Sequence, residues 1–182
     1  MTSENVLSAD NQQERLQLPH KWYIVGLVDG EGSFHIAIYK DSQMKTGLKI
    51  IPEFHVSQNA ASKKVLEELK QYFGCGYLKI NHLNRQSDQT MVYVVRNRAD
   101  LLGKIIPFFK QFPLRTTKAN DFNQFAKIVD LMNNGVHREK EGIREIIDCA
   151  YKMNQNAKRR KVSKHDLMYI VESSETTRGT QP

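Results

Sequence analysis

The chain has 182 residues, enough for one domain with tails or two small ones, and 40% of them are hydrophobic, enough to bury a core. Its 27 Lys and Arg outnumber 20 Asp and Glu, and the net charge of +7 favours a polyanionic partner, either a nucleic acid or an anionic surface. Cys75 and Cys149 are far apart and in no metal-ligand spacing, so we expect reduced core thiols in an intracellular protein. No signal peptide, transit-like start or transmembrane run is apparent, so we expect no membrane partner.

Residues 1–18 are polar and lack an apolar period, so we expect a flexible N-terminal arm. The apolar stretch 19–30 that follows predicts a helix in which two glycines four residues apart share one face. A face without side chains lets a second backbone approach closely, and the stretch is far shorter than the roughly 20 apolar residues that cross a bilayer. We therefore expect the helix to pair with a second copy of the chain through Ile24, Gly26, Leu27 and Gly30.

One acid, Glu31, stands between glycines at the end of this helix. If two such helices pack about a two-fold axis, two Glu31 carboxylates converge, and like charges that close need a cation between them. Hard oxygen ligands suit Mg²⁺ or Ca²⁺, and Mg²⁺ is the ion usually shared with phosphates. From composition alone, the stretch Asp29-Gly30-Glu31-Gly32 is more simply a helix stop with surface charges.

From Ser33 the period changes to two, which predicts a strand with Phe34, Ile36 and Ile38 on its apolar face. A turn over 41–47 leads to a return strand, in which Pro52 lacks a ladder donor and predicts a bulge or a sheet edge. The opposite face is mixed and hydrogen-bonding, although an ordinary solvated face is the alternative from the residues alone. Its members are Ser33, His35, Ala37, Tyr39, Asp41, Lys49, Ile51, Glu53, His55 and Ser57.

The pattern predicts a helix over 59–73 and a second hairpin from strands over 77–84 and 89–95. Outward residues of this hairpin are Lys79 and Asn81, with Arg85 at the loop tip and Gln89, Met91 and Tyr93 preferred in the last strand. A helix over 99–109 follows, either continuous or broken at Pro107, and then come closing helices over 119–133 and 138–154. A polar tail over 158–182 opens with the basic run Lys158-Arg159-Arg160-Lys161 and includes a short helix near 165–171.

The order helix, hairpin, helix, hairpin, helices predicts an α+β domain with a four-stranded, mostly antiparallel sheet. The motif Ile24-Val25-Gly26-Leu27-Val28-Asp29-Gly30-Glu31-Gly32-Ser33-Phe34 resembles the signature of the LAGLIDADG homing endonucleases, and a weaker resemblance extends to about residue 150. The resemblance implies the αββαββα saddle of that family, with a curved sheet and helices on one face. Because the motif occurs once, it implies a two-fold homodimer, with the endonuclease domain over 19–157.

The resemblance also implies site residues. Glu31 binds the catalytic divalent metal, for which Mg²⁺ is expected and Ca²⁺ or Mn²⁺ are substitutes, and the Gly30 carbonyl assists. Gln58 positions a water, and a basic residue, Arg115 or more readily Lys118, neutralises charge on the reacting phosphate. Ser62 stands where some relatives carry an arginine, so no basic contribution is expected there.

By the same resemblance, the outward strand residues named above lie in the DNA major groove, and Lys63 with other basic residues holds phosphates. The implied function is a site-specific endonuclease that recognises a long pseudo-palindromic target in double-stranded DNA, hydrolyses phosphodiesters and leaves short 3′ overhangs. The alternatives are an intron RNA maturase, a non-catalytic DNA-binding regulator on the same fold, or a basic α+β domain of another role. We expect an intron-borne gene in a bacterial or organellar genome.

Overall fold

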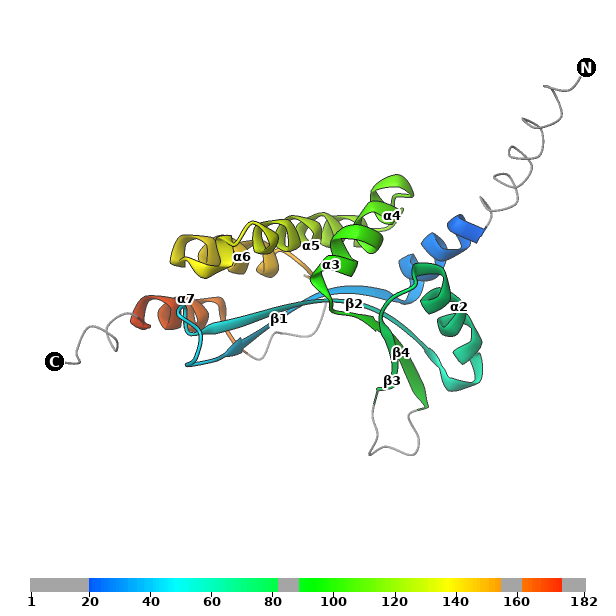
Figure 1. The fold of residues 1–182 in the computed structure, drawn as a ribbon, viewed down its shortest axis with the longest axis horizontal. Coiled ribbons are helices and arrows are strands. Elements are labelled where there is room, and N and C mark those ends of the chain that lie inside the picture. Colours follow the sequence, from blue (N-terminus) through cyan, green and yellow to red (C-terminus); the bar gives the residue numbers. More distant parts are fainter. Residues whose placement is uncertain (1–19, 82–88, 155–161, 175–182) are drawn as a thin grey trace, which may run out of the picture.

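The computed structural model describes residues 20–81, 89–154 and 162–174. Within them, four strands form one antiparallel sheet in the order β1-β2-β4-β3 (Figure 1). The strands are β1 (Gly32–Lys40), β2 (Leu48–Asn59), β3 (Tyr77–Ile80) and β4 (Thr90–Val95). The predicted α+β class with a four-stranded antiparallel sheet is confirmed.

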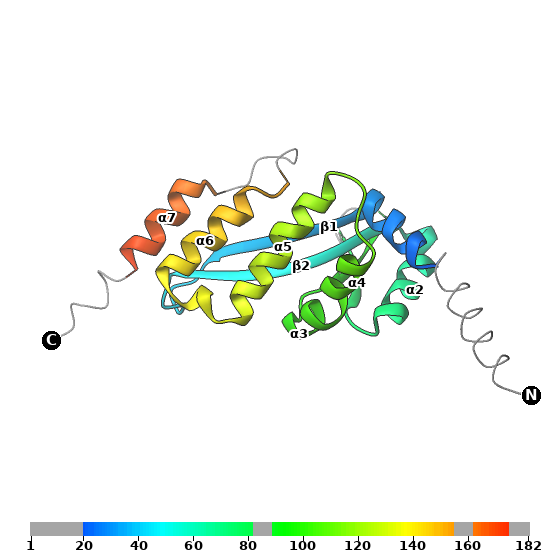
Figure 2. The same ribbon diagram turned by 90° about the horizontal axis from the view of Figure 1, so that it is seen from above.

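The first helix that the structure describes covers residues 20–31 and runs directly into β1. Helices α5 and α6 cover one face of β1 and β2, while the β3–β4 hairpin bends away on the other side (Figures 1 and 2). The remaining elements are η1 (Ala60–Ser62), α2 (Lys63–Phe73), α3 (Arg98–Asp100), the π-helical turn η2 (Leu101–Ile105), α4 (Ile106–Gln111), α5 (Lys118–Asn133), η3 (Val136–Arg138), α6 (Lys140–Tyr151) and α7 (Lys164–Ser173). Each described helix is too short or too polar to span a membrane.

Pro52 lies at a local edge of the sheet and not at a bulge. The β1–β2 register is continuous from Gly32 opposite Val56 to Lys40 opposite Leu48, and Ile36 pairs with Pro52. On its other side β2 pairs with β4 only from Phe54 onward. On the side of β2 that faces β4, no strand lies next to Pro52. Its missing N–H therefore costs no ladder hydrogen bond on that side. Pro107 is accommodated in a similar way, because the π-helical turn precedes it and places it in the first turn of α4.

An aromatic core lies between the sheet and the helices above it. The rings of Phe34 and Phe54 stack at 5.2 Å, and Phe34 also contacts Phe109, Phe122 and Phe125 at 5.3–5.7 Å. Burying each such side chain stabilises the fold by about 1.5–3 kcal/mol. Ile24, Val25 and Val28 of the first helix belong to the same core, so the helix that carries the motif is fixed to the sheet along one face.

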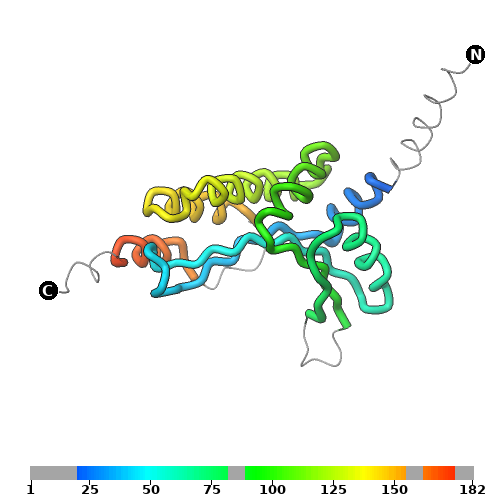
Figure 3. The backbone as a smooth tube through the Cα atoms, in the orientation of Figure 1, coloured from blue at the N-terminus to red at the C-terminus, as the bar shows by residue number. Residues whose placement is uncertain are grey.

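A second apolar cluster fixes α7 to the far end of the sheet, opposite the first helix (Figure 3). It consists of Leu48, Ile143, Ile147, Leu167 and Val171. The predicted short helix near 165–171 is therefore present, and it packs on α6 and β2 although the sequence places it in the tail over 158–182. The predicted arm over 1–18 and the basic run Lys158–Lys161 lie outside the described residues.

Candidate functional site

The junction between the first helix and β1 depends on Gly32. A Cβ atom at this position would lie 2.5 Å from Val28 Cγ1 and 2.6 Å from the Val28 carbonyl oxygen, so only glycine fits. The chain can then change from helix to strand within one residue. Glu31, the last helical residue, is left exposed at the helix end.

Lys118 lies against this helix end. Its Nζ atom donates hydrogen bonds to the carbonyl oxygens of Val28 at 2.8 Å, Asp29 at 2.9 Å and Gly30 at 3.4 Å. The unpaired carbonyls at the C-terminus of a helix carry partial negative charge, which attracts an ammonium group. Burial lowers the pKa of Lys118, while the charges of Asp29, Glu31 and Asp121 oppose that shift.

Asp29 holds the segment that carries Lys118. Its carboxylate accepts hydrogen bonds from the backbone nitrogen of Arg115 at 2.8 Å, the backbone nitrogen of Thr116 at 3.3 Å and the Thr116 hydroxyl at 2.7 Å. The helix end and the start of α5 are thus joined in both directions. The sequence analysis assigned no role to Asp29, and its position beside Glu31 was the only signal for one.

Arg115 and Lys118, the two candidates for the basic residue, point to different places. The Arg115 guanidinium lies over the Trp22 ring, 5.1 Å from its centroid, in a cation–π contact. The structure therefore brings Lys118, and not Arg115, to the carbonyl of Gly30.

Gln58 lies at the end of β2, two residues beyond Val56, which pairs with Gly32. This is the end of the sheet at which the first helix enters. The side chain is half-buried, and no hydrogen bond joins it to another residue in the described parts of the chain. Lys63, in the first turn of α2, forms an exposed ion pair with Glu67 at 3.6 Å.

The helix end fits a divalent cation in its chemistry. The exposed Glu31 carboxylate and the neighbouring Gly30 carbonyl are hard oxygen donors, the type that Mg²⁺ and Ca²⁺ prefer. The same carbonyl already faces a cationic group, the Lys118 ammonium. No group of three or more His, Cys, Asp or Glu side chains that could hold a metal occurs among the described residues. Among the described residues, the helix end offers two oxygen donors, the Glu31 carboxylate and the Gly30 carbonyl.

The β1–β2 register confirms the predicted facing of the first hairpin. Pairs such as Ser33 with His55 and Tyr39 with Lys49 lie on the sheet face opposite Phe34 and Phe54, which we call the outer face. His35, Tyr39 and Lys49 are exposed there, and Ser33, Ile51, His55 and Ser57 are half-buried. Ala37 is only 6% exposed, so its prediction as a direct contact is not supported. Asp41 lies in the turn and accepts a hydrogen bond from the Gln43 backbone nitrogen at 3.0 Å.

The facing predicted for the last strand is wrong by one residue. Tyr93 pairs with Val56, is fully buried, and donates its hydroxyl to the Cys75 carbonyl at 3.0 Å. Gln89 and Met91 share the alternation of Tyr93, so Thr90, Val92 and Val94 lie on the outer face instead. The apolar pattern could not decide the facing, because Val92 and Val94 on the outer face are buried as well, at 3% and 0% exposed.

The second hairpin otherwise faces as predicted. Lys79 pairs with Val92 on the outer face, and the backbone nitrogen of Asn81 donates to the Thr90 carbonyl. The predicted contact Arg85 lies outside the described residues. The outer face also contains Tyr77, opposite Val94, and Arg96, which continues the alternation of β4. Neither was predicted. Arg96 was missed because the alternation of the last strand had been set one residue out, whereas Tyr77 shares the alternation of Lys79, which was predicted correctly.

Glu53 is only 5% exposed on the outer face, so a direct contact through its carboxylate is not supported either. Its Oε1 lies 2.5 Å from Arg96 Nε and its Oε2 lies 2.9 Å from His55 Nε2. Burial lowers the pKa of His55 and outweighs the opposing effect of Glu53. The charges of Lys79, His35 and Arg96 lower it further.

The first helix leaves one face open. A Cβ atom at Gly26 or Gly30 would meet nothing within 4 Å, and Tyr23, on the same face, is 52% exposed. Leu27 is half-buried beside them. Ile24 is 2% exposed and packs in the core of its own chain, so its predicted place at a dimer interface is not supported. In the helical period, Ile24 lies on the face next to the one that Gly26 and Gly30 share.

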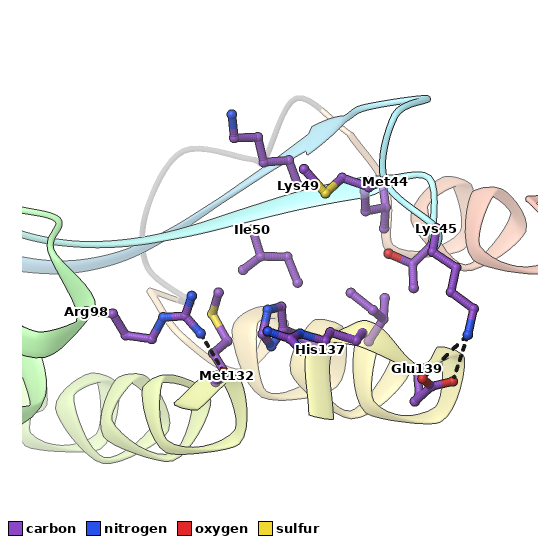
Figure 4. Close-up of a pocket in the computed structure, with 12 residues that line it drawn as sticks. Met44, Lys45, Lys49, Ile50, Arg98, Met132, His137 and Glu139 are labelled. Carbon is purple, nitrogen blue, oxygen red and sulfur yellow. Dashed lines mark hydrogen bonds and ion pairs between the residues drawn. The ribbon is translucent and has the colours of Figure 1, made fainter. Parts of the chain in front are cut away.

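A separate cavity of about 520 Å³ lies between the β1–β2 turn and the α5–α6 junction. Figure 4 shows Arg98 at one side, where its Nη1 donates to the Met132 carbonyl, and the ion pair of Lys45 with Glu139 at the other. Among the predicted site residues, only Lys49 lines it. Burial and the neighbouring arginines lower the pKa of His137 in its wall. The cavity does not include Glu31.

The sequence profile of a family described as "LAGLIDADG endonuclease" matches residues 24–129. Among curated proteins, a "Probable intron-encoded endonuclease 3" of Neurospora crassa is 36% identical over 133 residues. That match covers 73% of this chain, and the chain spans 24% of the Neurospora protein's length.

Two solved structures match over nearly their whole length. The structure described as "Crystal structure of a homing endonuclease, I-TnaI" is 34% identical with a TM-score of 0.71, and the match covers 85% of this chain and 97% of that one. The structure of "Archaeal Intron-encoded Homing Endonuclease I-Vdi141I Complexed With DNA" is 26% identical with a TM-score of 0.78. That match covers 86% of this chain and 97% of the other.

Proposed function

Because this chain belongs to the LAGLIDADG endonuclease family, we propose that it is a site-specific endonuclease that cuts double-stranded DNA at a long pseudo-palindromic target. One observation carries the proposal. At the end of the motif helix, the Gly30 carbonyl accepts a hydrogen bond from the Lys118 ammonium beside the exposed Glu31, and the outer face of the sheet begins at the same end.

The proposed active form is a homodimer. Gly26 and Gly30 carry no side chains and their face is open among the described residues, so the helices of two copies can pack closely about a two-fold axis. Each copy then brings one Glu31 to the axis. The related structure I-Vdi141I, described as complexed with DNA, supports the same type of partner for this chain.

In the proposed reaction, Glu31 and the Gly30 carbonyl of both copies hold divalent ions, for which Mg²⁺ is the first candidate. When bound, such ions activate water and stabilise the attacking and leaving oxygens of an in-line displacement. Lys118 places positive charge beside the phosphate as negative charge develops. Gln58 orients water at the same end of the sheet. Cuts on both strands across the minor groove leave short 3′ overhangs.

In the proposed complex, the outer face lies in the major groove and reads base edges. The excess of 27 Lys and Arg over 20 Asp and Glu favours phosphate contacts and makes binding salt-dependent. A dimer with two equal faces favours two similar half-sites. The relatives named as intron-encoded support an intron-borne gene, in a bacterial or organellar genome.

The test is to incubate the full chain and Mg²⁺ with a plasmid library that carries randomised inserts. Defined double-strand breaks at an enriched sequence are expected, and Glu31→Gln should abolish cutting while leaving DNA binding largely intact. Glu141→Gln, which changes an 82% exposed carboxylate on α6, is the matched control and should cut normally. Retained cleavage by Glu31→Gln would contradict the site assignment. Binding without cutting would favour a regulator, and activity on intron RNA alone would favour a maturase.

A further inference from the structure

The buried carboxylate of Glu53 takes no part in the proposed cleavage. It lies opposite His35 on the outer face, yet only 5% of the residue is exposed. Burying a carboxylate is costly unless it is paired and hydrogen-bonded. The Glu53 carboxylate has two such partners, Arg96 and His55, and they offset the cost of its burial.

Arg96 is placed by the strand register. Phe54 pairs with Val95, so the next residues along each strand, Glu53 and Arg96, come side by side on the outer face. The carboxylate is shared, with one oxygen 2.5 Å from Arg96 Nε and the other 2.9 Å from His55 Nε2. This ion pair at the inner nitrogen restrains the Arg96 side chain.

The outer edge of that guanidinium carries the two Nη atoms. The Arg96 side chain is 43% exposed, and within residues 20–81, 89–154 and 162–174 no acceptor is found for its two Nη atoms. Two parallel N–H donors from an arginine match the O6 and N7 acceptors of guanine in the major groove, which is the commonest base-specific contact. An arginine side chain already restrained by an ion pair loses less conformational entropy when it binds.

We infer that Arg96 reads a guanine in the major groove and that Glu53, with His55, is its positioning residue. This inference rests on the proposed function, because it needs the outer face to lie on DNA. His35, which faces Glu53, is three residues from Gly32, the first residue of β1, or about 10 Å at about 3.3 Å per residue. That is about three base-pair steps of about 3.4 Å. A homodimer would then require two symmetry-related guanines, one in each half-site.

The test is selection of DNA from a randomised library by binding in Ca²⁺, followed by sequencing, for the wild type, Arg96→Lys, Arg96→Ala and Glu53→Gln. The wild type should enrich guanine at one symmetric pair of positions. Replacing it by another base should weaken wild-type binding roughly 5- to 150-fold. Both Arg96 variants should lose the guanine preference at that pair of positions and keep the preferences at all other positions. Glu53→Gln should reduce the guanine preference without abolishing it. Arg96→Lys keeps the positive charge but removes the two parallel N–H donors of the guanidinium. Loss of the guanine preference in this variant would therefore show that the paired donors, and not the charge, carry it.

Arg144→Ala is the matched control, since it removes an arginine of similar exposure, 41%, from α6 on the helical side of the sheet. It should leave every base preference unchanged. An equal loss of affinity for all sequences in Arg96→Lys and Arg96→Ala would mean a phosphate contact, and an unchanged profile would mean a purely structural pair; either overturns the inference. If the wild type enriches no sequence at all, the proposed function fails instead. Thermal melting of each variant identifies those that do not fold, and Glu53→Gln and Arg96→Lys are the conservative changes for that reason.

Discussion

The carboxylate of Asp29 accepts a hydrogen bond of 2.8 Å from the backbone nitrogen of Arg115, which is 86 positions away in the sequence. In return, Lys118 donates to the Asp29 carbonyl at 2.9 Å. Asp29 thus joins the end of the motif helix to the start of α5, and it does so beside the exposed Glu31. These two contacts make the position of the Lys118 ammonium depend on Asp29, whose carboxylate is bonded to the start of the α5 segment.

Asp29→Ala should therefore lower both stability and cutting. It removes three hydrogen bonds to the segment that carries Lys118, which should cost about 1–2 kcal/mol in the free energy of unfolding, measured by urea titration. The cleavage rate should fall more than stability alone explains, because Lys118 loses its support. Asp130→Ala, which removes an exposed carboxylate of α5, should stay within about 0.5 kcal/mol of the wild type. Normal cleavage by folded Asp29→Ala would contradict the coupling.

Stability should fall as the pH drops below 6.5, the ordinary pKa of histidine, because burial lowers the pKa values of His55 and His137. The unfolded chain then binds more protons than the folded one, so protonation favours unfolding. Unfolding free energies measured by urea titration between pH 5 and 8 should show this slope. His55→Gln and His137→Gln should each reduce it, and the double variant should reduce it further. An unchanged slope in the double variant would show that other groups cause it.

The fold followed from the sequence wherever the apolar pattern was unambiguous. The first hairpin alternates cleanly around Phe34, and its facing came out correctly. The last strand has apolar residues at nearly every position, so only the packing of Tyr93 against the core decides its register. The burial of Glu53 could not be predicted either, because it depends on Arg96, which that register error had left off the outer face.

The motif itself gave the candidate Glu31, but the residues that support it come from distant parts of the chain. The sequence left Arg115 and Lys118 as alternatives, since both lie in one short segment before or within the start of α5. Only the three-dimensional contacts separate them: one stacks on Trp22 and the other reaches the helix end. Spacing along a chain cannot show which way two neighbouring long side chains turn.

Gly26→Leu should separate the proposed dimer without unfolding the monomer. A Cβ atom at Gly26 meets nothing within 4 Å in the described parts of the chain, so the fold should accept the side chain, and the helix should gain roughly 0.5–1 kcal/mol from losing a glycine. The added side chain would keep two helices apart. Sedimentation should give a monomer for this variant and a dimer for the wild type. Gly103→Leu makes the same change at another open helical glycine and should remain dimeric. A dimeric Gly26→Leu would rule out this face as the interface.

Lys118→Met and Arg115→Met should have different effects on cutting. The methionine at 118 keeps the aliphatic bulk but removes the ammonium from three helix-end carbonyls and from the neighbourhood of Glu31. We expect about 1–2 kcal/mol of lost stability, and a fall in the cleavage rate of about a hundredfold, since electrostatic stabilisation of the reacting phosphate is lost. The rate is measured in single-turnover assays with Mg²⁺ on the enriched target, and binding is measured separately.

Arg115→Met is the paired control, because it removes a cation that contacts the Trp22 ring and not the helix end. It should cost about 0.5–1 kcal/mol of stability and leave the cleavage rate within about threefold of the wild type. The pair of variants is informative because both remove one positive charge from the same segment, so a general loss of attraction for DNA would affect them equally. The opposite ranking, with Arg115→Met inactive and Lys118→Met active, would reassign the basic residue and leave Lys118 as a structural cap on the motif helix.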